Sequence, residues 1–290
     1  MLFEGKITLD RLKDVGFLKR LAPKLHLEDE KFCKSVNPVP LSIEELEDRQ
    51  ARLKREGYFE VDAAFQRLDV GAMADLVSNL AHQNLPTVLA FLYDEFWAIY
   101  SALDPLLKPA LGGSYARLPD FWCWHVDPRK EESGWGPHRD KGASSMFPDW
   151  SPKSVTAWIP LTDATPLNGC MYIVPADRDP HSRNPNNLQM PPGYKLQDVR
   201  ALPAKAGTMF VWDQNVVHWG SHASARAPEP RISIALEFQS TAIPAMNSPL
   251  MGALECPSLK MRRKLIGKQM LQYKHMYALA PEYERWAKAA

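Results

Sequence analysis

The stretch from Arg231 to Phe238 constrains the fold of this chain most strongly, because two kinds of side chain alternate along it without interruption. One set is wholly apolar and the other includes a cation, a hydroxyl and a carboxylate: Ile232, Ile234, Leu236 and Phe238 against Arg231, Ser233, Ala235 and Glu237. Successive side chains of a strand point to opposite faces. The stretch therefore predicts a strand with one face in an apolar core and the other available for chemistry.

Other short runs rich in β-forming residues begin at Phe121. They cover residues 121–126, 154–162, 169–174 and 208–213, and the alternating strand closes the series at 231–239. A chain in which several short strands follow a helical region is typical of helices packed on one side of a double-sheet jelly roll. We expect an α+β protein with a mainly β core.

Helical spacing dominates the chain before these strands. Ser42 and Glu45 form a capping box, so a helix should begin there and end at Gly57. Two apolar stripes follow, and we expect both to pack against the sheet: Met73, Leu76, Val77 and Leu80 on one helix, and Leu85, Leu89, Leu92, Phe96 and Ile99 on a second.

We divide the chain into three parts. Residues 1–40 form an irregular extension, 41–240 one domain with a helical part (41–115) and a jelly-roll core (116–240), and 241–290 a helical extension. Two loops, 141–153 and 176–207, are unusually long for a compact domain, and such loops are functional or disordered. The first follows directly after the metal-binding pattern described next and should form a pocket wall; for the second, a functional role and surface decoration both stay open.

His138 and Asp140 lie two residues apart in Gly136-Pro137-His138-Arg139-Asp140, and His218 and His222 lie far downstream. Two imidazoles and one carboxylate are the ligand set of the facial triad of non-haem Fe(II) oxygenases, which leaves coordination positions open. Either downstream histidine could complete the set. His125 lies on a predicted strand and could face pocket or core, while His26, His82, His181 and His275 have no companion ligands nearby.

Arg231 and Ser233 share the polar face of the alternating strand. A guanidinium and a hydroxyl two residues apart can converge on one carboxylate. Close to a metal triad, this pair indicates a dicarboxylate co-substrate.

Taken in order, these pieces resemble the phytanoyl-CoA dioxygenase family of Fe(II)/2-oxoglutarate oxygenases from about Gly57 to Phe238. The resemblance rests on the following segments: His138-Arg139-Asp140, Trp158-Ile159-Pro160-Leu161, Asn168 to Pro175, Gly207 to Asp213, His218, and Arg231-Ile232-Ser233. It implies a double-stranded β-helix. It also implies iron held by His138, Asp140 and His218, and 2-oxoglutarate held by Arg231, Ser233 and Trp158.

The resemblance further implies that O2 and 2-oxoglutarate are consumed, succinate and CO2 are released, and a C–H bond of a small organic molecule is oxidised. Related halogenases have a small residue where this chain has Asp140, so the carboxylate favours hydroxylation or a similar oxidation. Two alternatives stay open: a cupin-like isomerase or hydrolase that does not use 2-oxoglutarate, and a catalytically silent binding protein on the same fold.

The substrate is not identified by the sequence, and acyl-CoA esters, amino acids and natural products all stay open. Aromatic and sulfur-containing side chains near the motifs suggest an apolar pocket. The candidate pocket residues are Trp122, Trp124, Met146, Phe147, Trp150, Trp219 and His222.

Composition limits the classes of partner that we expect this protein to bind. The formal net charge of +1 gives no electrostatic case for nucleic acid. Four cysteines without disulfide-like spacing, no signal-like start and no long apolar run lead us to expect a reduced, cytoplasmic protein that does not bind membranes. A C-terminal helix from Ser258 to Ala290 should carry a solvated basic face, and a homodimer through this helix stays open.

Overall fold

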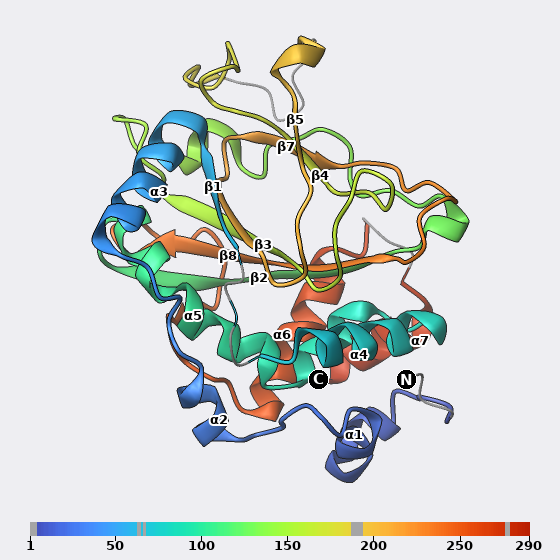
Figure 1. Cartoon of the computed structure of the whole chain (residues 1–290). Helices are drawn as coiled ribbons and strands as arrows, with labels where there is room; N and C mark the ends of the chain where they lie inside the picture. Colours follow the sequence, from blue (N-terminus) through green and yellow to red (C-terminus); the bar gives the residue numbers. More distant parts are fainter. Residues whose placement is uncertain (1–4, 63–64, 66–67, 187–193, 276–278) are drawn as a thin grey trace.

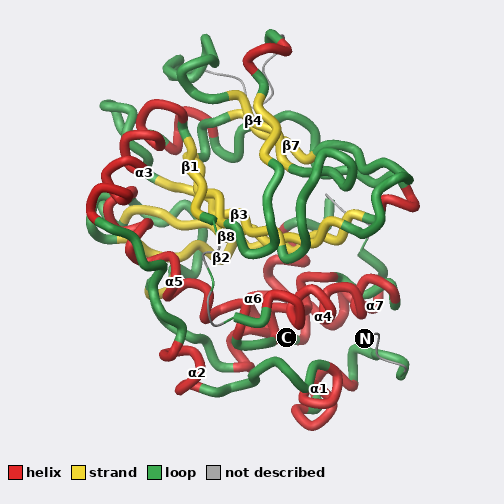
Figure 2. The backbone as a smooth tube through the Cα atoms, viewed as in Figure 1, coloured by secondary structure: helices red, strands yellow, loops and turns green. Residues whose placement is uncertain are grey.

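The computed structural model of the chain describes residues 5–62, 65, 68–186, 194–275 and 279–290. Two antiparallel sheets face each other, and helices cover the outer face of the larger sheet (Figures 1 and 2). The strands are β1 (Tyr58–Val61), β2 (Tyr115–Val126), β3 (Ser154–Pro160), β4 (Met171–Val174), β5 (Arg200–Leu202), β6 (Met209–Asp213), β7 (Val217–Gly220), β8 (Arg231–Ser240) and β9 (Met251–Gly252).

The larger sheet has the order β1-β6-β3-β8-β2-β9, with β8 between β3 and β2. Its register places Ile234 of β8 opposite Ile159 of β3 and Cys123 of β2. The alternation along β8 holds in full: Ile232, Ile234, Leu236 and Phe238 belong to the core between sheet and helices, while Arg231, Ala235 and Glu237 line a cavity on the other face. The strand predicted from Arg231 to Phe238 is therefore present with the expected orientation.

The smaller sheet has the order β5-β4-β7. Its β7 pairs with β4 so that His218 lies opposite Ile173. A second core fills the space between the sheets, with Trp158, Phe210 and Trp212 of the larger sheet packed near Met171 and Ile173 of the smaller one. This sandwich with a helical cover is the expected jelly roll. β1, β5, β7 and β9 were not among the predicted strands, because each is only two to four residues long.

The helices lie mainly on the outer face of the larger sheet (Figure 1). They are α1 (Val15–Leu21), α2 (Glu30–Ser35), α3 (Ile43–Glu56), α4 (Val70–His82), α5 (Glu95–Ala110), α6 (Leu259–Gln272) and α7 (Pro281–Ala289), with short 3-10 turns η1 (Arg11–Lys13), η2 (Thr87–Leu92), η3 (Pro128–Lys130), η4 (Gly142–Ser145) and η5 (Leu196–Asp198). The Ser42–Glu45 capping box forms at the start of α3, and Gly57 ends that helix in the left-handed conformation.

Three expectations for the helical parts were wrong. The stripe from Leu85 to Ile99 is divided between η2 and α5, because Tyr93 is extended between them, although the stripe itself is buried as expected. Residues 1–40 contain α1 and α2, each capped by an aspartate side chain (Asp14 and Asp29). The C-terminal segment is two helices, the second beginning at Pro281. The two long loops also contain short elements: η4 in the first, and η5 and β5 in the second, whose residues 187–193 lie outside the described part.

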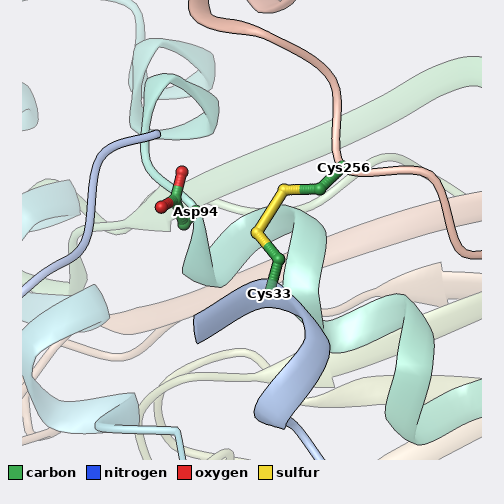
Figure 3. Close-up of side chains that lie close together, drawn as sticks. All are labelled: Cys33, Asp94 and Cys256. Atoms are coloured by element: carbon green, nitrogen blue, oxygen red, sulfur yellow. A yellow bond between two sulfur atoms is a disulfide. The ribbon is translucent and has the colours of Figure 1, made fainter. Parts of the chain in front are cut away.

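The expectation that the four cysteines are all reduced also requires correction. Cys33 on α2 and Cys256, just before α6, form a disulfide although 223 positions separate them (Figure 3). Such a pairing has no local spacing by which a sequence could reveal it. Cys123 and Cys170 are free. No helix in the described part of the chain combines the length and the apolar character that crossing a membrane requires.

Candidate metal centre

His138, Asp140 and His218 come together between the two sheets, at the end of β7. The backbones of His138 and His218 pair through reciprocal hydrogen bonds, N–H to carbonyl, of 3.1 and 3.0 Å. This single antiparallel bridge sets the two imidazole rings side by side, with centroids 4.5 Å apart. Each Nε2 lies 3.5 Å from Oδ1 of Asp140. The three side chains thus present two nitrogens and one oxygen to a common point, with all three atoms within 4.8 Å of one another.

The tautomer of both histidines follows from their backbone neighbours. Nδ1 of His138 lies 2.8 Å from the carbonyl of Gly136, and Nδ1 of His218 lies 3.2 Å from that of Val216. A carbonyl can only accept, so each Nδ1 carries the hydrogen and donates it. Each Nε2 then has its lone pair free, which is how metal-binding histidines are usually prepared.

Asp140 is held through one oxygen only. Its Oδ2 accepts hydrogen bonds from Oγ1 of Thr156 on β3 (2.8 Å) and from Nε1 of Trp212 on β6 (3.2 Å). Burial alone would raise the pKa of Asp140, but the two imidazoles outweigh it and hold that pKa well below its usual range. The carboxylate in turn raises the pKa of His138 against the effect of burial. The site therefore favours a negative carboxylate with Oδ1 free, which suits a divalent cation.

Arg231 extends into the same cavity from β8. Its side chain is 1% exposed, and Nη1 donates to Oγ of Ser233 at 2.5 Å. In the described part of the chain no carboxylate lies within ion-pair distance of it, and its Nε has no hydrogen-bond partner. Burial lowers the pKa of Arg231 to about 10. A buried cation without a counter-ion is costly, so an anionic ligand at this guanidinium would offset the cost of its burial.

Trp158 adds a second donor without a partner. Its Nε1 is buried and makes no hydrogen bond among the described residues, and the Arg231 guanidinium carbon lies 5.9 Å from the centre of its ring. Two glycines leave room beside this pair. A Cβ on Gly134 would come within 2.7 Å of the Gly220 backbone and 3.4 Å of Nη2 of Arg231, so a side chain there would enter the space that a ligand of the guanidinium needs. The two donors without partners, on Arg231 and Trp158, and the space left by the two glycines fit a bound carboxylate.

The metal cavity, as we call the space lined by these residues, contains some of the predicted pocket residues and not others. Trp122 and Trp124 on β2 line it, and Trp135 does so as well. Thr156, Trp212, Trp135 and Glu237 were not predicted, although Thr156 and Trp212 alternate with core residues on β3 and β6 and so could have been assigned to the inner face.

Five predicted pocket residues lie elsewhere, which corrects that expectation: Met146, Phe147, Trp150, Trp219 and His222. Trp219 points away from His218 because neighbours on a strand face opposite sides, and it stacks on Tyr172 with centroids 5.7 Å apart. The loop 141–153 contains a Met146–Pro152 bridge and supplies no lining residue of the metal cavity, although its Lys141 forms an ion pair with the lining residue Glu237. His222 is exposed, and its backbone pairs with that of Ser133.

A second group with metal-binding donors lies at the disulfide, where Asp94 is next to Cys33 and Cys256 (Figure 3). Asp94 is already saturated. Its Oδ1 forms an ion pair with Nη1 of Arg262 at 2.5 Å, and it accepts hydrogen bonds from the backbone amides of Glu28 (3.0 Å) and Asp29 (2.7 Å). With its sulfurs bonded to each other, this group is a structural link. Arg262 was expected on a solvated basic face and is instead buried in this link.

Comparison with known proteins identifies the family of this chain and structures of similar fold. The family model described as phytanoyl-CoA dioxygenase (PhyH) matches residues 40–228, which confirms the family expected from the sequence. No curated protein sequence matches the chain.

Several solved structures have a similar fold. EctD from S. alaskensis has a TM-score of 0.55 at 17% identity, covering 81% of this chain and 92% of its own. SnoN, the epimerase solved with Fe3+, alpha ketoglutarate and nogalamycin RO, has a TM-score of 0.52 at 17% identity, covering 72% of this chain and 93% of its own. SnoK, a non-heme alpha ketoglutarate dependent carbocyclase, has a TM-score of 0.51 at 16% identity, covering 73% and 96%. The likeness confirms the expected fold.

Proposed function

The chain belongs to the phytanoyl-CoA dioxygenase family, the Fe(II)- and 2-oxoglutarate-dependent oxygenases, and within that class we propose that it hydroxylates a C–H bond of a small organic substrate. One observation carries the proposal. Arg231 is a buried cation without a counter-ion, and it lies in the same cavity as three converging metal-binding donors. A dicarboxylate bound to a metal at one end and to a guanidinium at the other matches both requirements.

The residues then have defined roles. Nε2 of His138, Nε2 of His218 and Oδ1 of Asp140 hold Fe(II), which when bound with 2-oxoglutarate supplies the oxidising power. Arg231 binds the far carboxylate through its planar fork, and Ser233 orients that fork. Trp158 donates its indole N–H to the same ligand. Thr156 and Trp212 keep Asp140 aimed at the metal.

Hydroxylation is one of several outcomes that the same C–H cleavage can have. Structures of similar fold include an epimerase (SnoN) and a carbocyclase (SnoK), so stereochemical inversion or ring closure is the second candidate. Product mass separates the three outcomes. Hydroxylation adds one oxygen atom, inversion leaves the mass unchanged, and ring closure removes two hydrogen atoms.

The deciding experiment is an anaerobic titration of the purified chain with Fe(II) and then 2-oxoglutarate, followed by visible absorption. We expect a charge-transfer band that requires both additions, and succinate release when O2 is admitted. If Fe(II) binds and no band or succinate follows, the oxygenase proposal fails and a cupin-like metal enzyme without 2-oxoglutarate takes its place. Compounds that stimulate succinate release are then analysed for product mass.

A further inference from the structure

A second and much larger cavity, which we call the outer chamber, adjoins the metal cavity. Its volume is about 650 Å³, against about 40 Å³ for the metal cavity. The two share Trp122, Trp124 and Trp135 as walls. Small-molecule sites usually measure roughly 300–1,000 Å³. The body of an organic substrate therefore fits the outer chamber, and only its reacting end fits beside the metal.

The outer chamber follows an unpaired edge of the larger sheet. β9 pairs only with Ala116 and Arg117 of β2, and beyond them this edge has no strand partner among the described residues. The chamber wraps around the edge at residues 122–125, so both faces of β2 contribute. The end of α4, the turn η2 and the helices α6 and α7 form the remaining walls.

The wall shared with the metal cavity is aromatic. Trp122 and Trp124 lie nearly parallel, with centroids 5.8 Å apart and an interplanar angle of 14°. Trp135 meets them edge-on, at 87° and 85°. Indole rings in this arrangement present flat apolar surface to a ligand, which favours a ring over a flexible polar chain.

The charges of the outer chamber cancel locally. Arg129 pairs with Asp127 at 2.9 Å, and Lys130 pairs with Glu132 at 3.7 Å. Asp127 also accepts a hydrogen bond from the backbone amide of Arg129, and Glu132 from that of Asp127. Among the lining residues that the structure describes, two cations therefore face two carboxylates, and the lining has no excess charge that would favour a phosphate or an ammonium group.

Among the described lining residues, one buried side-chain polar atom has no hydrogen-bond partner. Nε2 of His125 is buried and makes no hydrogen bond among the described residues. Burial lowers the pKa of His125, so the ring is neutral near pH 7. The neighbouring His82 ring, 6.1 Å away, has its own Nδ1 bound to the carbonyl of Ser78. A neutral imidazole nitrogen can exchange one hydrogen bond with a ligand hydroxyl or carbonyl.

We propose, on the basis of the function proposed above, that the outer chamber binds the body of the substrate and that this substrate is uncharged and ring-bearing. A ring lies against the tryptophan wall, and an oxygen function of the substrate hydrogen-bonds with His125. This chemistry selects against acyl-CoA esters, whose phosphates meet no excess positive charge, and against free amino acids. His125 is then a specificity-determining residue.

Matched probes test the proposal in the anaerobic Fe(II)/2-oxoglutarate complex: 2-naphthol, 2-methylnaphthalene, 2-naphthoate and coenzyme A, with binding measured by calorimetry. We expect 2-naphthol to bind more tightly than 2-naphthoate, and coenzyme A not to compete with it. His125→Leu should weaken 2-naphthol about threefold to tenfold and leave 2-methylnaphthalene unchanged. His125→Gln should restore most of the loss, and Trp124→Ala should weaken the binding of both 2-naphthol and 2-methylnaphthalene.

Two controls separate the possible failures. His222→Ala alters an exposed side chain outside both cavities and should change none of the affinities. The charge-transfer band, recorded for every variant, reports an intact metal site. A wild-type chain without the band defeats the proposed function. A chain with the band defeats this proposal alone if it binds no 2-naphthol, if coenzyme A displaces 2-naphthol, or if His125→Leu changes its affinity by less than twofold.

Discussion

Two groups of side chains in the described part of this chain have the donors of a metal centre, and they differ in what those donors already bind. In the group at Cys33, Asp94 and Cys256, the sulfurs bind each other and the carboxylate binds Arg262 and two backbone amides. In the group at His138, Asp140 and His218, each side chain is anchored through one atom and leaves another free. Both groups bring three potential ligand atoms within 4.8 Å of one another, and only in the second do free lone pairs remain among the described residues.

The arginines beside the two groups differ in the same way. Arg262 and Arg231 are each 1% exposed. Arg262 has the carboxylate of Asp94 together with the carbonyls of Leu92 and Pro257. Among the described residues, the only hydrogen-bond acceptor of Arg231 is the hydroxyl of Ser233. A buried cation with its partners within the chain is already neutralised, and one without them is free to bind an anionic ligand.

The largest expected effect comes from the triad. His138→Ala, Asp140→Ala and His218→Ala should each abolish turnover and lower bound iron, because a three-ligand site has no spare donor. Iron content after anaerobic loading and succinate release measure this. His222→Ala is the matched control and should retain both. Loss of iron in His222→Ala with retention in His218→Ala would assign the third ligand to His222.

A substitution in the group at Cys33, Asp94 and Cys256 should change the free energy of unfolding. Arg262→Met leaves the Asp94 carboxylate buried without its cation, and breaking such a pair costs about 3–5 kcal/mol of unfolding free energy. Denaturant unfolding measures the loss, and iron binding should be unchanged. Lys264→Met, at an exposed position of the same helix, should change stability by no more than about 0.5 kcal/mol. Equal effects of the two substitutions would contradict the contrast drawn above.

Asp213 extends the comparison to a buried carboxyl that, among the described residues, has no cation within ion-pair distance. Burial raises its pKa to about 7. Because the folded-state pKa exceeds the unfolded value, its contribution to stability is complete below about pH 4 and is lost as pH rises through 7, by about 4 kcal/mol at most. Asp213→Asn should flatten the decline in unfolding free energy between pH 5 and 8. An unchanged pH profile would show that the carboxyl is ionised throughout.

Arg231→Ala should raise the apparent 2-oxoglutarate constant about tenfold to a hundredfold, since a lost charged hydrogen-bond partner costs roughly 1.5–3 kcal/mol. Iron content should be nearly intact. Arg231→Lys should rescue only in part, because an ammonium lacks the planar fork, and Ser233→Ala should have a smaller effect in the same direction. A constant unchanged within about twofold in Arg231→Ala would remove 2-oxoglutarate from this cavity.

The smallest effect concerns the anchoring of Asp140. Thr156→Val removes one of the two hydrogen bonds to Oδ2 while keeping the side-chain shape. Losses of such supporting contacts weaken metal binding about 10–100-fold, and we expect about tenfold because Trp212 still donates. Anaerobic iron titration measures it. An affinity equal to that of the unaltered chain would show that the triad needs no support from β3.

Sequence patterns predicted the parts of this molecule that depend on periodicity. The alternation of β8 and the capping box of α3 were correct because each is a local rule that residues a few positions apart satisfy. The grouping of His138, Asp140 and His218 followed from a family pattern, and their role as ligands stays a prediction.

What could not be predicted depends on long-range packing. The Cys33–Cys256 bond and the burial of Arg262 join the two ends of the described chain, and no local spacing indicates them. The loop 141–153 was assigned to a pocket wall by its position in the sequence, whereas its fold depends on an internal Met146–Pro152 bridge and on backbone hydrogen bonds from Lys141 and Gly142 to Gln214. Short strands such as β7 lack the length that a period of two needs to be recognised.

The alternation of side chains along β8 has a consequence for how such an enzyme can evolve. Arg231, Ala235 and Glu237 line the metal cavity, and even-numbered positions from Ile232 to Phe238 hold the helices to the sheet. A library randomised at Ala235 and Glu237 would vary the lining of the metal cavity while keeping Arg231 and Ser233, and one randomised at the even positions would vary thermal stability. Stability of the fold and chemistry of the cavity therefore evolve through alternate residues of the same strand.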